Sequence, residues 1–267
     1  MNNQAIGLID SGYGGLSLAK ELKRLLPLET LLYFGDNARA PYGNQELSQV
    51  EVMIHQLADF LIEEGVKAIV VACNTGTVAA LDSLVKRWDI PILGVIDGGV
   101  EAAVQTTQNK KMGLIATRGT IESQVYPQKI KALDPDIIIY EKACPHLVDL
   151  VESGQLSGVK VDSLVASQLE PIKQAGVDSL ILGCTHFPLL SQPIQKYMGS
   201  AVSLVDPGVN TIQELANQLK DLDLLAEERQ GEDLYYTSGD PLAFARLASQ
   251  WLALEDVQVS EINIGGA

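Results

Sequence analysis

The sequence predicts an α/β protein with two similar, doubly wound domains whose sheets are mostly parallel. Short β-branched runs alternate with longer stretches of helical periodicity, which is the pattern of helices packed on parallel sheets. The 267 residues suffice for two modest domains or one large one. Three strand motifs also recur in the same order later in the chain, which indicates a duplicated unit.

Nine apolar runs are expected to form strands, and helical stretches fill most of the intervals between them. The expected strands are AIGLID (5–10), TLLYFGD (30–36), AIVVAC (68–73), PILGVID (91–97), MGLIAT (112–117), DIIIYE (136–141), SLILGC (179–184), AVSLVD (201–206) and DLYYTS (233–238).

The duplicated unit is visible in the spacing of the recurring motifs. GLI occurs at 7 and 113, a cysteine closes a strand at 73 and 184, and an aspartate closes one at 97 and 206. These separations of 106, 111 and 109 residues nearly agree. We therefore expect one domain over 1–97 plus 207–267 and a second over 98–206, related by a pseudo-twofold axis, with the boundary near Gly98 and Gly99.

Composition excludes several classes of protein. The 46% hydrophobic and 20% charged residues are typical of a globular protein with a sizeable core. A formal charge of −15 argues against nucleic acid as the primary ligand. The N-terminus lacks the pattern of a signal peptide and no apolar run reaches about 18 residues, so we expect a cytoplasmic protein without a membrane partner. The three cysteines have no close spacing and are expected to be reduced thiols.

Two cysteines are the main candidates for chemistry. Ligands of parallel α/β sheets collect beyond the carboxyl ends of the strands, and Cys73 in VVACNTGT and Cys184 in SLILGCTHFP occupy such ends. If the two domains face each other, these residues approach a shared cleft from opposite sides. A thiolate is a capable base and a thiol a capable acid, so the pair suits inversion of a carbon stereocentre.

The alternative is that these cysteines only pack, because cysteine is among the residue types most often buried. The matched positions favour chemistry, and so do the polar neighbours Asn74, Thr75, Thr185 and His186. Cys144 has no counterpart in the other half and is interpreted as structural.

Two further clusters could hold a small ligand. In IDSGYGGLSLAKEL, Asp10 and Ser11 end a strand, and a glycine turn leads into a helix whose N-terminus could bind a carboxylate or phosphate. In FGDNARAPYGN, the turn Pro41-Tyr42-Gly43 could place backbone donors and one hydroxyl against a ligand.

The remaining polar candidates leave alternatives open. His186 could poise or reprotonate a thiol, or act as acid and base itself. Arg39 either binds a carboxylate of the ligand or faces solvent. Two cysteines and one histidine are too few for a structural zinc site, and no cofactor motif is visible, so neither metal nor cofactor is expected.

The stretches DSGYGGL, GDNARAPYG, VVACNT and GCTHFPLL resemble the signature segments of the glutamate racemase family, in order from residue 5 to about 240. The resemblance implies two α/β domains with a cofactor-independent site between them. It also implies interconversion of L- and D-glutamate, which supplies D-glutamate for peptidoglycan. The family commonly forms dimers, so a homodimer is expected.

The resemblance also assigns roles to residues. Cys73 would act on the D-enantiomer and Cys184 on the L-enantiomer, supported by Asp10, Glu152 and His186. The implied substrate-binding residues are Asp10, Ser11, Pro41, Tyr42, Gly43, Asn74, Thr75, Thr185 and His186.

Three positions depart from the family pattern, namely Tyr13, Gly76 and Gly98. Tyr13 is the largest change, because its ring could narrow the entrance or fill a gap between the domains.

Two rival functions stay open. A related two-cysteine racemase acting on aspartate or another acidic amino acid would use the same fold. A binding protein that captures an acidic metabolite without chemistry would keep the cleft and make no use of the thiols.

Overall fold

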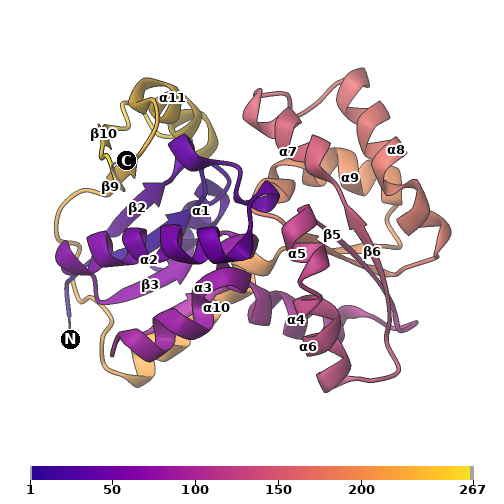
Figure 1. The fold of residues 1–267 in the computed structure, drawn as a ribbon, viewed down its shortest axis with the longest axis horizontal. Helices are drawn as coiled ribbons and strands as arrows, with labels where there is room; N and C mark the ends of the chain where they lie inside the picture. The colour runs from indigo at the N-terminus through magenta and orange to yellow at the C-terminus, as the bar shows by residue number, and fades with distance from the viewer. Residues whose placement is uncertain (1, 265–267) are drawn as a thin grey trace.

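The structure is a computed structural model that describes residues 2–264. Residues 1 and 265–267, the two ends of the predicted first domain, lie outside the described part. Figure 1 shows two lobes side by side, one containing β2, α2 and α11 and the other containing β5, β6 and α8. All the strand pairings described are parallel. The predicted α/β class with parallel sheets is therefore confirmed.

The first lobe contains a six-stranded sheet in the order β10-β9-β2-β1-β3-β4. Its central strand β1 is buried along its whole length, as expected for a parallel strand covered on both faces. The strands are β1 (Ile6–Asp10), β2 (Leu31–Gly35), β3 (Ala68–Val71), β4 (Ile92–Gly94), β9 (Leu234–Thr237) and β10 (Val259–Glu261).

The second lobe contains a four-stranded sheet in the order β6-β5-β7-β8. This order repeats that of β2-β1-β3-β4 in the first sheet, so the duplication expected from the motif spacing is also present in the topology. The strands are β5 (Lys111–Ala116), β6 (Ile138–Ala143), β7 (Ser179–Gly183) and β8 (Ser203–Val205).

Helices cover both faces of each sheet because each carries an apolar stripe. On the first sheet, α2 and α3 contribute to one buried cluster and α1, α10 and α11 to another. On the second sheet, α4 and α6 lie on one side and α7, α8 and α9 on the other. The helices are α1 (Leu16–Leu25), α2 (Leu47–Glu63), α3 (Asn74–Arg87), α4 (Val95–Thr106), α5 (Arg118–Glu122), α6 (Val125–Leu133), α7 (Pro145–Glu152), α8 (Val159–Gln174), α9 (Ser191–Met198), α10 (Pro207–Asp221) and α11 (Pro241–Leu252).

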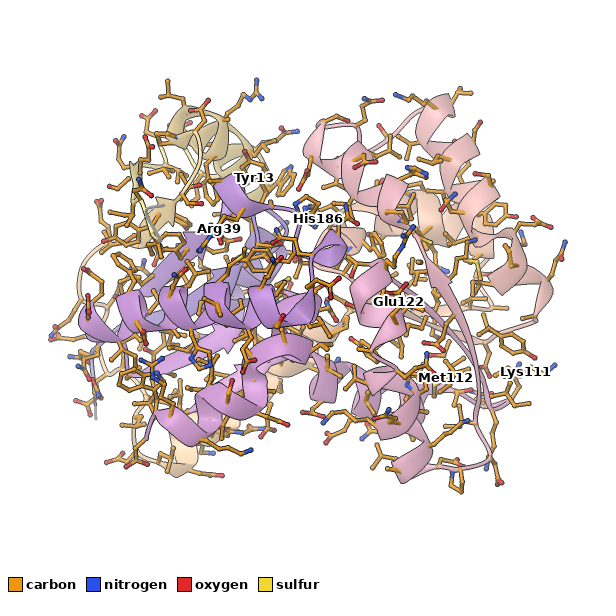
Figure 2. All side chains as sticks on the ribbon, viewed as in Figure 1. Tyr13, Arg39, Lys111, Met112, Glu122 and His186 are labelled. Atoms are coloured by element: carbon orange, nitrogen blue, oxygen red, sulfur yellow. The ribbon has the colours of Figure 1, made fainter. Side chains whose placement is uncertain are left out.

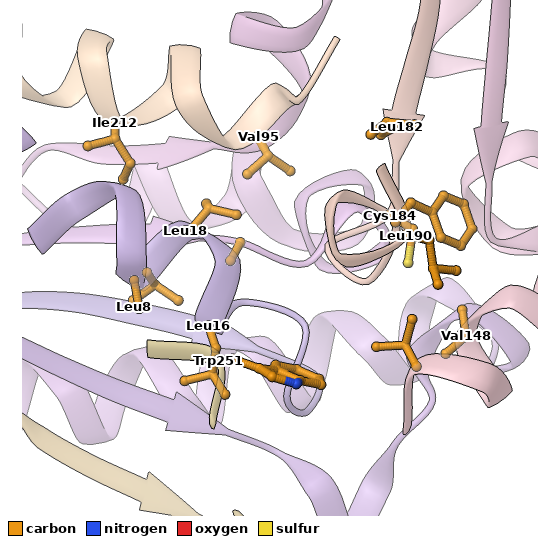
Figure 3. Close-up of a cluster of buried hydrophobic side chains, with 14 of the residues drawn as sticks. Leu8, Leu16, Leu18, Val95, Val148, Leu182, Cys184, Leu190, Ile212 and Trp251 are labelled. Atoms are coloured by element: carbon orange, nitrogen blue, oxygen red, sulfur yellow. The ribbon is translucent and has the colours of Figure 1, made fainter. Parts of the chain in front are cut away.

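The largest apolar cluster is continuous between the two lobes. It contains Leu16 and Leu18 of α1 together with Leu182 of β7 and Leu190, and Figure 3 shows these side chains with Cys184 among them. Because interiors are close-packed, this shared core fixes one strand end of the second sheet against the first lobe.

The prediction of a strand over 91–97 is wrong for its second half, because β4 ends at Gly94. The ladder between β3 and β4 ends where Val71 pairs with Gly94, and Val95 begins α4. Asp97 therefore lies in the first turn of a helix, where a carboxylate is favoured by the helix dipole, and it forms an ion pair with Lys129. It does not close a strand.

Three other features differ from the prediction or stay untested. Strand β10 was not expected, because its three residues are largely exposed and give no apolar run. Strand β6 is displaced by two residues from the expected 136–141. Helix α4 continues through Gly98 and Gly99, so no loop marks the predicted domain boundary, and its position stays a prediction.

Candidate active site

Cys73 and Cys184 occupy equivalent places just beyond the ends of β3 and β7, each the inner strand next to an edge strand of its sheet. Both are only 6% exposed, and both line one cavity of about 290 Å³. The structure thus brings together the two thiols that the sequence singled out.

Most of the predicted site residues line the same cavity, whereas Asp10 and Glu152 do not. Those that do are Ser11, Pro41, Tyr42, Gly43, Cys73, Asn74, Thr75, Cys184, Thr185 and His186.

Cys73 is held at the N-terminus of α3. Its Sγ atom accepts a hydrogen bond from the Gly76 N–H at 3.4 Å and donates to Ser11 Oγ at 3.7 Å. Burial raises the pKa of the Cys73 thiol to about 12, and the nearby Asp10 carboxylate adds to the increase. Cys73 is therefore a protonated thiol at neutral pH.

Cys184 has a histidine as its polar partner. The Nδ1 atom of His186 lies 3.6 Å from Cys184 Sγ, and Nε2 lies 3.4 Å from Glu152 Oε1. The second contact is an ion-pair distance without hydrogen-bond geometry, since Nε2 has no hydrogen-bond partner among residues 2–264. Burial alone would lower the pKa of His186, but the contacts with Cys184 and Glu152, and the charge of Asp10, raise it to about 10. The imidazole is therefore cationic at neutral pH.

Asp10 lies behind the cavity wall at the end of β1. It is fully buried, and its carboxylate accepts hydrogen bonds from the Gly12 N–H at 3.0 Å and the Thr185 hydroxyl at 3.2 Å. Burial raises the pKa of Asp10, and the charge of His186 opposes the increase. Asp10 thus positions Thr185 and connects the two lobes.

The turn at 41–43 reaches the cavity, but its hydroxyl is committed elsewhere. Tyr42 lines the cavity but donates its O–H to the Asp36 carboxylate, so the hydroxyl proton is not available to a ligand, and binding of substrate by Tyr42 stays a prediction. Asp36 also binds Arg39, whose Nε lies 2.7 Å from Oδ2. Arg39 does not line the cavity, and Figure 2 shows it within the first lobe. Arg39 therefore supports the turn.

The structure adds cavity residues that the sequence analysis did not single out. All but one of them follow strands β5 and β6, at the edge of the second sheet where Cys184 also lies. Thr117 stands out because its hydroxyl lies 3.0 Å from Thr75 Oγ1, across the two lobes. The rule that ligands collect at strand ends could have found them. They are Thr117, Arg118, Pro145, His146, Val148 and Asp149, together with Asn44 from the first lobe.

Cys144 is the buried thiol outside the cavity. Its side chain is fully buried and its Sγ donates to the Lys142 carbonyl at 3.7 Å, in keeping with a structural role. No cluster of three His, Cys, Asp or Glu within residues 2–264 could hold a metal ion. In the same described range, no helix is long and apolar enough to cross a membrane.

Comparison with known proteins places this geometry in a family. Residues 6–215 match the model of the Asp/Glu/Hydantoin racemase family. The chain is 43% identical to the glutamate racemase of Latilactobacillus sakei subsp. sakei (strain 23K) over 264 residues, which covers 99% of this chain and 96% of that protein.

Solved structures agree with this comparison. Glutamate racemase isoform RacE1 from Bacillus anthracis superposes with a TM-score of 0.95 at 35% identity and covers 99% of this chain and 100% of its own. Glutamate racemase from Francisella tularensis subsp. tularensis SCHU S4, in complex with D-glutamate, gives a TM-score of 0.91 at 34% identity, with 98% of each chain covered. The chain described here therefore belongs to the Asp/Glu/Hydantoin racemase family and is an isomerase of the racemase class.

Proposed function

We propose that this protein interconverts L- and D-glutamate by a two-base proton transfer at the α-carbon, without a cofactor, and so supplies D-glutamate for peptidoglycan. The observation that carries the proposal is that Cys73 and Cys184 end equivalent strands and line one cavity. The choice of glutamate rests on the relatives, which are named glutamate racemases.

The reaction requires one thiolate and one thiol on opposite faces of the substrate. In the L-to-D direction, the Cys184 thiolate takes the α-proton of L-glutamate and the C–H electron pair stays on the α-carbon. The Cys73 thiol then gives its proton to the opposite face, which leaves a thiolate at Cys73 and a thiol at Cys184. The reverse direction exchanges the two roles.

The electrostatics of the cavity suit this starting state. Cys73 holds its proton at neutral pH, as an acid must, and the cationic His186 lies 3.6 Å from Cys184 Sγ. The α-proton of an amino acid is weakly acidic, so a site shielded from bulk water with fixed donors aids carbanion formation.

The substrate would be held mainly by backbone N–H groups and small polar side chains. Helix α3 begins beside Cys73 at Asn74 and Thr75, where free N–H groups can bind a carboxylate. Asp10 would act through Thr185 and His186, and Glu152 through His186. A homodimer and a cytoplasmic location stay predictions.

The proposed reaction is tested with L-glutamate in deuterated water, with no pyridoxal phosphate or metal added. We expect the circular dichroism signal to decay to zero while deuterium enters the α-position. Faster inversion of aspartate would overturn the choice of substrate. An absence of both exchange and inversion with either amino acid would favour the binding-protein alternative.

Serine substitutions test the two-base step. Cys73→Ser and Cys184→Ser are each expected to lower the racemisation rate by at least about a thousandfold, because hydroxyls are far weaker acids than thiols. Each variant should keep α-proton exchange for one enantiomer only, L-glutamate for Cys73→Ser and D-glutamate for Cys184→Ser. Cys144→Ser is the matched control, since Cys144 is also buried but lies outside the cavity. Parent rates in both cavity variants would refute the mechanism.

A further inference from the structure

A buried hydrogen bond joins the second lobe to a predicted substrate-binding residue of the first. The Tyr126 hydroxyl, on α6, donates to Asn74 Oδ1 at 2.7 Å. Tyr126 is fully buried and Asn74 is 4% exposed. The ring of Tyr126 packs in the apolar cluster between α4, α6 and the second sheet, with Ala103 and Leu114 among its members. The hydroxyl is therefore held rigidly where it meets Asn74.

The direction of this hydrogen bond is fixed by the chemistry of the phenol. Burial raises the pKa of Tyr126, and the charges of Asp206, Asp97 and Cys184 raise it further, so the hydroxyl keeps its proton. Within residues 2–264, Asn74 is the only hydrogen-bond partner of this hydroxyl. The Tyr126 O–H must therefore donate, and Asn74 Oδ1 must accept.

This leaves the Asn74 amide with its donor end unused. No described residue accepts a hydrogen bond from Nδ2 of Asn74, and the side chain lines the cavity beside Cys73. An amide free to rotate could present either its oxygen or its NH₂ group to a ligand. With Oδ1 held by the Tyr126 O–H, the polar group that the Asn74 amide has left without a partner is Nδ2, which suits an acceptor such as a carboxylate oxygen.

We propose that Tyr126 is a positioning residue that locks the Asn74 amide with Nδ2 toward the cavity, where it donates to a carboxylate of the substrate. This inference rests on the proposed function for the identity of the substrate. It adds a residue that touches no substrate and acts through Asn74. It also makes carboxylate binding on the first lobe depend on the placement of α6 in the second lobe.

The test is Tyr126→Phe, which removes the hydroxyl and keeps the ring in its cluster. We expect KM for both enantiomers to rise about five- to twentyfold while kcat changes by less than about threefold, because the lost interaction binds substrate and transition state alike. Tyr235→Phe is the matched control, since Tyr235 is also buried and no residue in the described part of the chain forms a hydrogen bond with its hydroxyl. The control should leave KM unchanged.

A double-mutant cycle separates positioning from general packing. Once Asn74→Ala has removed the amide, adding Tyr126→Phe should raise KM by less than about twofold. If Tyr126→Phe raises KM by the same factor in both backgrounds, or lowers kcat instead, the positioning role is wrong.

Direct binding distinguishes failure of this inference from failure of the proposed function. The dissociation constant of L-glutamate is measured by calorimetry in Cys73→Ser, with and without Tyr126→Phe. A racemisation assay that fails with the parent protein refutes the proposed function. Equal dissociation constants in the two Cys73→Ser proteins refute the role of Tyr126 alone.

Discussion

The Nδ1 atom of His186 lies 3.6 Å from the Sγ atom of Cys184, and both side chains are more than nine-tenths buried. In water an imidazole loses its proton near neutrality, whereas this pocket raises the pKa of His186 to about 10. The two residues are only two positions apart in the sequence. The positive charge of His186 is also stabilised by Glu152 of α7, whose Oε1 lies 3.4 Å from Nε2.

The stability of the protein should therefore depend on the protonation of His186. Its pKa is raised from 6.5 to about 10 in the folded state, so the stabilisation is complete below pH 6.5 and is lost as pH rises toward 10. His186→Gln should remove this dependence, which has a slope of at most about 1.4 kcal/mol per pH unit. Urea unfolding of both proteins between pH 6.5 and 10 measures it.

The exposed His146 provides the control for this experiment, because His146→Gln removes a histidine outside the buried contact. The prediction would be contradicted if the free energy of unfolding changed with pH by the same amount in the parent and in His186→Gln across this range.

Gly14 should be essential for the geometry of the site. A Cβ atom there would lie 2.2 Å from Thr185 Oγ1 and 2.6 Å from His186 Nδ1, so Gly14→Ala must displace both side chains. We expect kcat/KM to fall by at least about a hundredfold, because small displacements at a reacting centre have effects of this size. Gly119→Ala is the control, since its Cβ would meet only ordinary contacts of 3.5 Å or more. Equal activity of the two variants would disprove the argument.

The sequence predicted the strand ends well because a parallel sheet forces them to one edge. Cys73 and Cys184 were found by this rule, and it would have led to Thr117 had it been applied to every strand. The expectation that Asp97 closes a strand was wrong, because the sequence does not show that the pairing of β4 with β3 ends at Gly94.

Side-chain partners could not be predicted, because they depend on packing between distant segments. The Tyr42 hydroxyl donates its proton to Asp36, a partner that the sequence did not indicate. Tyr13 does not line the cavity. Its ring packs instead on Phe244 and Trp251 of α11, with centroids 5.4 and 6.5 Å apart, 231 and 238 positions later in the sequence.

Asp206 should make the protein less stable at alkaline than at acidic pH. Burial raises its pKa from 3.8 to about 6, so the charged form lowers folded-state stability above pH 6, and this effect vanishes below pH 3.8. Asp206→Asn keeps an oxygen for the Gly208 N–H at the start of α10. We expect the variant to be about 1–2 kcal/mol more stable than the parent at pH 8 and equal to it near pH 4.

Urea unfolding at both pH values measures this difference. Asp240→Asn, at the exposed N-terminus of α11, controls for loss of a capping carboxylate. If Asp206→Asn destabilises the protein equally at both pH values, the carboxylate contributes through its cap and not through a buried charge.

Arg118 should attract the anionic substrate to the cavity. Among the described residues it is the only lysine or arginine that lines the cavity, and its side chain forms no ion pair or hydrogen bond within that part of the chain. On a protein of net charge −15, a local cation at the mouth offsets repulsion of a dicarboxylate. Arg118→Gln should raise KM about three- to tenfold at low salt, and the effect should shrink near 0.5 M salt, where charges are screened beyond about 4 Å.

The control for Arg118 is Lys86→Gln, which removes one positive charge from α3 at a groove outside the cavity. Because both variants change the net charge equally, only a local interaction can separate them. A KM for Arg118→Gln that matches that of the control, or that stays raised by the same factor at high salt, would show that Arg118 does not attract the substrate through its charge. A salt-dependent rise of KM in Arg118→Gln alone would show that Arg118 attracts the substrate through its charge, in addition to the buried cation of His186.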